Sequence, residues 1–124
     1  MVARVSVVVR DPDLAQLLAE VLHEHGHEVQ RDGEVDDVVG YLAREQPDLL
    51  ILDVWWEMPA QGGDVVEHVR EDQGQPTPTI LIVGDKQEIA GREDWLAAHR
   101  IHALLAPFDV REFEQLVATA LAER

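Results

Sequence analysis

The sequence of 124 residues contains no cysteine and one serine, Ser6. Without cysteine, disulfides, thiolate metal ligands and cysteine nucleophiles are all excluded, which agrees with a reducing compartment. Ser6 lies inside an apolar stretch and not in a nucleophile elbow. No apolar run is long enough to cross a bilayer, and the N-terminus has no signal-peptide cleavage site. We therefore expect a cytoplasmic protein with no membrane partner.

Basic residues are also scarce. Ten Lys and Arg stand against 25 Asp and Glu, which gives a formal net charge of −15. A field of this sign repels nucleic acid and anionic lipid, so no nucleic-acid partner is expected. A basic protein partner, or solubility alone, is the interpretation that the charge favours.

Glycine-rich phosphate-binding loops are absent as well. The stretches "GEVDDVVGYL" and "QGGDVV" lack the spacing and the strand-to-helix context of such loops. A flavin site would need a hydroxyl-rich loop after the first strand, where this chain has "RDPD". We therefore predict no enzymatic activity and no resident cofactor.

Short apolar runs alternate with segments of helical period along the chain, a pattern typical of a parallel sheet covered by helices. Strands are predicted over 3–9, 27–32, 48–54, 79–83 and 101–106. Helices are predicted over 11–26, 33–46, 63–72 and 110–124, and the segment 84–100 is predicted to hold a loop and the fourth helix. The result is one α/β domain over residues 1–124, with a doubly wound parallel sheet.

Several residues support these boundaries. Asp11 is placed to cap the first helix, with Pro12 at its first position and Gly26 at its end. Its buried stripe is predicted to contain Leu14, Leu17, Leu18, Val21 and Leu22. Gly91 interrupts the segment 84–100. The strand 48–54 is apolar without alternation, which predicts a central strand that is covered on both faces.

Ligands of doubly wound sheets bind at the carboxyl ends of the strands. In this sequence those ends are residues 9–13, 53–63, 83–86 and 106–109. Functional residues are therefore expected in these four segments.

The same segments resemble the receiver domain of two-component response regulators. The relevant stretches are "VVRDPD" (8–13), "LLILDV" (49–54), "ILIVGD" (80–85) and "LLAPFD" (104–109). The resemblance implies a flavodoxin-like fold of three α/β/α layers, with a five-stranded sheet of order 2-1-3-4-5. It places Asp53 at the phospho-acceptor position of a phosphorelay. It also implies a protein partner, either a histidine kinase or a downstream signalling protein, and a homodimer through the fourth helix, fifth strand and fifth helix.

Other positions of the family motif have changed. Val9 and Arg10 stand where the family has its acidic pair, beside Asp11. Val83 replaces the hydroxyl residue, and Ala106 replaces the lysine before Pro-Phe. Ala103 stands at the aromatic switch position, and Pro59 follows Asp53 by six residues instead of four, so this loop is longer by about two.

These changes bear on phosphotransfer, which needs a divalent cation and a cationic side chain to neutralise the phosphoryl oxygens. Val9 has no oxygen ligand for Mg²⁺ and Arg10 repels a cation, so Asp11 and Asp53 are weak metal candidates only. The sequence therefore predicts an atypical, degenerate receiver (a pseudo-receiver), with no catalytic residue, that acts as a protein-interaction module. If the chain is complete, its output is binding.

Two alternatives stay open. In the first, Asp53 is a working acceptor, Mg²⁺ binds, and Asp11 or Glu57 supplies the missing ligand. In the second, the chain is a small-molecule-binding domain on the same fold. For the degenerate form, Arg10 is a candidate to form an ion pair with Asp53 or Asp11 and so imitate phosphate and metal.

Aromatic and histidine residues give further candidates. Trp55 and Trp56 are adjacent at the rim of the predicted site, where one of them is a candidate anchor for a partner. Trp95 is interpreted as packing on the fourth helix. The histidines of "HEHGH" (23–27) suggest a metal site, but the helix end predicted at Gly26 separates them, and histidines in a last turn interact favourably with the helix dipole.

Overall fold

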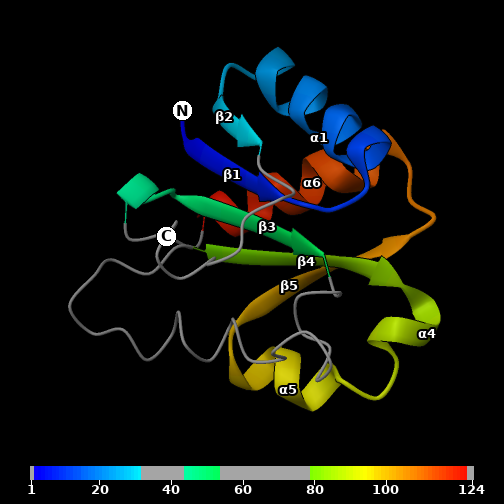
Figure 1. Ribbon diagram of the computed structural model, residues 1–124. Helices are drawn as coiled ribbons and strands as arrows, with labels where there is room; N and C mark the ends of the chain where they lie inside the picture. Colours follow the sequence, from blue (N-terminus) through cyan, green and yellow to red (C-terminus); the bar gives the residue numbers. More distant parts are fainter. Residues whose placement is uncertain (1, 32–43, 54–78, 123–124) are drawn as a thin grey trace.

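The computed structural model describes residues 2–31, 44–53 and 79–122 (Figure 1). Its elements are β1 (Arg4–Val8), α1 (Pro12–Glu24), β2 (Glu28–Arg31), β3 (Leu49–Asp53), β4 (Thr79–Asp85), α4 (Lys86–Ile89), α5 (Glu93–Ala98), β5 (Ile101–Ala106) and α6 (Val110–Ala122). Residues 44 and 45 are helical, as predicted for the end of the helix over 33–46. The rest of that helix up to residue 43, and the predicted helix over 63–72, lie outside the described residues.

The five strands form one parallel sheet of order β2-β1-β3-β4-β5, which confirms the predicted fold class. Strand β3 is central, with β1 on one side and β4 on the other. Its residues Leu49 to Leu52 are completely buried, as expected from an apolar run without alternation.

Helices α1 and α6 cover one face of this sheet (Figure 1). Leu18 of α1 and Phe113 of α6 belong to one buried cluster with Val7, Ile51 and Leu81 of the strands. The alternate strand residues point to the opposite face because the side-chain period of a strand is two. Those residues are buried as well, namely Val8, Leu50, Leu52, Ile80 and Ile82. Both faces of the sheet centre are therefore excluded from water.

The first helix begins at the predicted residue, and one of the residues predicted on its buried face is exposed. Asp11 caps α1, and Pro12 is its first residue. The most deeply buried positions of the helix are Ala15, Leu18, Ala19 and Leu22, which repeat at the spacing i, i+3, i+4 and i+7. Leu17 is 41% exposed, so its predicted burial is wrong. The two small alanines turn the buried stripe away from Leu17 and let the helix approach the sheet.

Helix α1 ends in a Schellman turn around Gly26, whose φ is +83°. The Gly26 N–H donates to the His23 carbonyl oxygen at 2.9 Å, and the His27 N–H donates to the Leu22 carbonyl oxygen at 3.1 Å. This turn reverses the chain into β2 directly after the helix. The predicted end at Gly26 is confirmed.

The segment 84–100 differs from the predicted loop and single irregular helix, because it contains two short helices. Strand β4 continues to Asp85 because its pairing with β5 extends to the pair Asp85 and Ala106. Two short helices follow, α4 with a capping box between Asp85 and Glu88, and then α5. Gly91 separates them with a φ of +82°, which agrees with its predicted role as an interruption. None of the helices described is long and apolar enough to cross a membrane.

Candidate functional site

The candidate site lies at the carboxyl edge of the sheet, where the ends of parallel strands meet. Asp53 is the last residue of β3 and is half-buried. Val83 of β4 is its direct neighbour in the sheet. On the other side, Val8 pairs with Leu52, so Val9 and Arg10 leave β1 beside Asp53. The fold therefore brings together the residues that the sequence placed in one pocket.

The main chain of Arg10 holds the Asp53 carboxylate. Its N–H donates a hydrogen bond to Asp53 Oδ2 at 2.8 Å, and Asp53 Oδ1 is buried from solvent. The Arg10 residue itself is exposed. A link between the two residues was expected, and this bond is made through the backbone. The predicted ion pair of the Arg10 guanidinium with Asp53 or Asp11 stays a prediction.

Asp11 is the nearest carboxylate in the sequence, and its side chain caps α1. Asp11 Oδ1 accepts hydrogen bonds from the backbone N–H groups of Asp13, at 3.0 Å, and Leu14, at 3.3 Å. These bonds satisfy amides that the first helical turn leaves without partners. A cation that bound through Asp11 Oδ1 would compete with this cap.

The remaining positions of the pocket carry no polar side chain. Val9 and Val83 are buried, with exposed fractions of 1% and 3%, and belong to the core cluster under α1 and α6. Ala106 is half-buried at the end of β5, before a cis peptide bond to Pro107. Ala103 is half-buried and pairs with Ile82. Hydroxyl and ammonium groups are therefore missing from these positions of the edge.

Mg²⁺ places strict requirements on the ligands at this edge of the sheet. Mg²⁺ requires near-octahedral oxygen ligands, usually with one or two carboxylates. Within residues 2–31, 44–53 and 79–122, no group of three or more His, Asp or Glu side chains has the geometry of a metal site. After β1 and at the end of β3, the side chains of Asp11 and Asp53 each already accept backbone hydrogen bonds. The described residues thus do not fit an ordinary magnesium site.

Several predicted residues lie outside the described part of the chain. Trp55, Trp56 and Glu57 are among them, together with the lengthened loop up to Pro59. Their predicted roles stay predictions. Trp95 is described, on α5, where its half-buried ring lies 5.2 Å from the ring of His99, in agreement with a packing role.

The histidines of "HEHGH" have separate partners. His25 Nε2 lies 2.6 Å from Glu114 Oε2 of α6, and His27 Nδ1 accepts a hydrogen bond from the Ala3 N–H at 3.0 Å. Burial lowers the pKa of His27 below its ordinary value, and the neighbouring His25 and the chain N-terminus lower it further. These contacts connect the turn after α1 to α6 and to Ala3, the residue before β1, which the sequence analysis did not predict. The feature of the sequence that could have indicated these contacts is Gly26 at the end of α1. The Schellman turn at this glycine places His25 and His27 on either side of it.

A hollow of about 340 Å³ lies between β5 and α6, away from Asp53. It is lined by Ala103, Leu104, Leu105, Glu112, Gln115, Leu116 and Thr119. Leu105 is 44% exposed, and Val110 at the start of α6 is 42% exposed. This is the fifth-strand and last-helix part of the face that the sequence analysis named for dimerisation.

Comparison with known proteins gives the class of this fold and site. The family model of the response regulator receiver domain matches residues 5–118. The chain therefore belongs to the receiver domain family of two-component signal transduction. Receiver domains interact with kinases and other signalling proteins. Comparison with curated proteins gave no match.

Solved structures agree with this assignment. A candidate response regulator from Chloroflexus aurantiacus J-10-fl is 26% identical, with a TM-score of 0.80 over 98% of this chain and 99% of that chain. A response regulator receiver protein from Burkholderia phymatum is 22% identical, with a TM-score of 0.71 over 96% and 94%. NtrX from Brucella abortus, solved in complex with ADP, is 20% identical with a TM-score of 0.77, and this chain spans 99% of its own length but only 27% of NtrX.

Proposed function

We propose that this receiver domain is a protein-interaction module that works without ordinary magnesium-dependent phosphorylation of Asp53. It acts by binding and not by catalysis, and its partner is a histidine kinase or a downstream signalling protein. One observation carries the proposal. The side chains around Asp53 at the carboxyl edge are apolar at Val9, Val83 and Ala106, and Asp11 caps a helix.

The chemistry of phosphotransfer explains why this observation matters. The transferred phosphoryl group carries negative charge on three equatorial oxygens, and cations in the site must neutralise it. Removing one such stabilising group commonly slows a reaction by about 10²- to 10³-fold. Ala106 supplies no ammonium group and Val83 supplies no hydroxyl group. The hydrogen bond that the Arg10 N–H donates to Asp53 supports a structural role for this carboxylate.

The second candidate is a working phospho-acceptor, and the position of Asp53 favours it. Asp53 ends the central strand at the carboxyl edge, where ligands of this fold bind. The experiment that separates the two candidates incubates the protein with acetyl phosphate or beryllofluoride in the presence of Mg²⁺. Intact mass and amide spectra are compared with those of Asp53→Asn. Our proposal expects no modification and the same spectra with and without these reagents.

If the wild type is not modified, a variant with the missing side chains restored tests whether their absence is the reason. Val83→Thr with Ala106→Lys restores the hydroxyl and ammonium groups without adding a charge in the core. We expect this variant to be modified more than the wild type and to lose that modification when Asp53→Asn is added. Stoichiometric modification of the wild type at Asp53, with a conformational response, would overturn the proposal and establish the working acceptor.

We also propose that the face around β5 and α6 is the contact surface, either for the partner or for a second copy of the chain. The exposed Leu105 beside an open hollow supports this assignment. Sedimentation equilibrium of Leu105→Asp tests for self-association through this face. Leu17→Asp is the matched control, since Leu17 on α1 is exposed to a similar extent, 41% against 44%. A dimer that both variants lose, or that neither variant loses, contradicts self-association through this face.

A further inference from the structure

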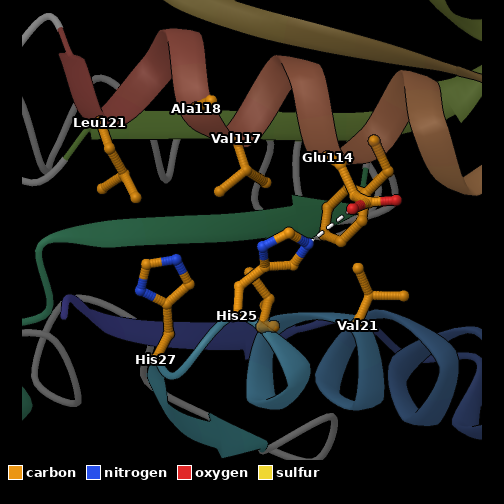
Figure 2. A pocket seen from close by; sticks show the side chains of 9 residues that line it. Val21, His25, His27, Glu114, Val117, Ala118 and Leu121 are labelled. Atoms are coloured by element: carbon orange, nitrogen blue, oxygen red, sulfur yellow. Dashed lines mark hydrogen bonds and ion pairs between the residues drawn. The ribbon is translucent and has the colours of Figure 1, made fainter. Parts of the chain in front are cut away.

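A second cavity, of about 260 Å³, lies between α1 and α6 (Figure 2). We call it the helix-pair cavity. Its apolar walls are Val21 and Leu22 of α1 and Phe113, Val117, Ala118 and Leu121 of α6. None of the residues of the Asp53 site lines it. Helix α1 runs from the carboxyl end of β1 back to the start of β2, so the end that lines this cavity lies away from Asp53.

Three polar side chains complete the lining, namely His25, His27 and Glu114. Figure 2 shows both histidine rings extending from the end of α1 toward α6, with His25 linked to Glu114. Pockets that bind small molecules have this composition, an apolar wall with a few polar groups that fix orientation. The Schellman turn at Gly26 produces it, because it places two histidines at one end of the helix pair.

The proton of His27 can be assigned from its contacts. Its Nδ1 accepts the hydrogen bond from Ala3 N–H, so Nδ1 carries no proton. The neutral ring therefore carries its proton on Nε2, which is a hydrogen-bond donor. The lowered pKa of His27 agrees with a neutral ring at pH 7. The Glu114 carboxylate is an acceptor, so His25 Nε2 donates to it, and this pair satisfies both groups.

Size and charge restrict the ligand further. A dry protein cavity of about 150 Å³ binds benzene, so this larger cavity has room for one ring with a substituent. An anion would be opposed by the net charge of −15 and by Glu114. A cation would lose its hydration against apolar walls beside His25 and His27.

We propose that the helix-pair cavity binds a small uncharged aromatic molecule with one hydrogen-bond acceptor, which takes a hydrogen bond from His27 Nε2. This binding is independent of phosphorylation at Asp53 and of the contact surface on β5. Such a ligand contacts α1 and α6 at once and therefore favours the arrangement in which the two helices are packed as in this structure.

A titration followed by amide and methyl spectra tests this site with three probes. Phenol has the ring and the acceptor, toluene has a similar shape without the acceptor, and benzoate carries a negative charge. We expect saturable shifts at Val117 and His27 with a Kd for phenol of about 1 mM. Toluene should bind about fivefold more weakly, since it lacks one hydrogen bond. Benzoate should not bind. Benzoate binding more tightly than phenol would overturn the assignment of an uncharged ligand.

Variants separate the cavity from nonspecific binding. Val117→Phe fills the cavity and should abolish the phenol shifts, while Val110→Phe, the same change at an exposed position of the same helix, should leave them. If Val117→Phe fails to fold, Ala118→Phe closes the cavity from its exposed side. His27→Asn keeps an acceptor for Ala3 N–H, but its shorter side chain has no donor at the position of Nε2, so it should bring phenol down to the affinity of toluene. Absence of saturable binding, or shifts that survive both filling variants, would overturn the site.

Discussion

The backbone N–H of Arg10 lies 2.8 Å from Asp53 Oδ2 and donates a hydrogen bond to it. This bond connects the loop after β1 to the end of the central strand. This hydrogen bond needs an acceptor oxygen at Asp53, which an uncharged amide side chain also has.

Exchanging Asp53 for Asn and for Ala separates the acceptor from the charge. Both variants remove one negative charge, but only Asn keeps a carbonyl oxygen for the Arg10 N–H. We expect Asp53→Ala to lower the free energy of unfolding by about 1 to 2 kcal/mol, and Asp53→Asn by about half of that or less. Urea unfolding followed by far-UV circular dichroism measures both. Equal losses in the two variants would contradict a role for the acceptor.

The main chain of Arg10 makes the bond to Asp53 Oδ2, so Arg10→Ala leaves this bond in place. A double-mutant cycle of Arg10→Ala and Asp53→Asn is therefore expected to give a coupling energy below about 0.5 kcal/mol. Arg111→Ala, another exposed arginine, combined with Asp53→Asn gives the baseline. A coupling above about 1 kcal/mol in the first cycle alone would establish the guanidinium ion pair that the sequence suggested.

Asp11 should behave as a helix cap and not as a metal ligand. Asp11→Ala removes the acceptor for two backbone N–H groups and is expected to cost about 1 kcal/mol of unfolding free energy, while Asp11→Asn should cost only a few tenths. Asp13→Ala, in the same helical turn, controls for the lost charge. Urea midpoints measured with and without Mg²⁺ check both roles. A stabilisation by Mg²⁺ that Asp11→Asn removes would show metal binding instead.

The parts of this molecule that the sequence predicted are those set by local pattern. The unbroken apolar run before Asp53 predicted the central strand, and Asp11, Pro12 and Gly26 predicted both ends of α1, because caps and turns depend on a few adjacent residues. The apolar replacements around Asp53 could also be identified, since their positions follow from strand ends. Family resemblance supplied the strand order.

Features that depend on how elements pack were not predicted. Leu17 is exposed because Ala15 and Ala19 set the rotation of α1, and β4 runs on to Asp85 because β5 pairs with it there. The helix-pair cavity lies between two helices that are far apart in the sequence. His25 and Glu114, which are in contact at this cavity, are 89 positions apart. Such contacts depend on how two helices are placed relative to each other. The hydrophobic periodicity of each helix alone does not determine this placement.

The titration of His27 should make stability depend on pH in a defined direction. Its pKa in the folded protein is lowered from the ordinary value of 6.5, so between these two values the unfolded chain binds more protons than the folded protein. The free energy of unfolding should therefore decrease as the pH falls below about 6.5, and the loss should continue down to the folded pKa. One proton limits this slope to about 1.4 kcal/mol per pH unit.

His27→Asn keeps the bond from Ala3 N–H but does not titrate. The difference in the free energy of unfolding between this variant and the wild type should therefore be constant above pH 7 and should change below it. His23→Asn, at an exposed histidine of the same helix end, is the matched control for removing an imidazole ring. Parallel pH profiles for the wild type and His27→Asn would show that His27 is not protonated more easily in the unfolded chain.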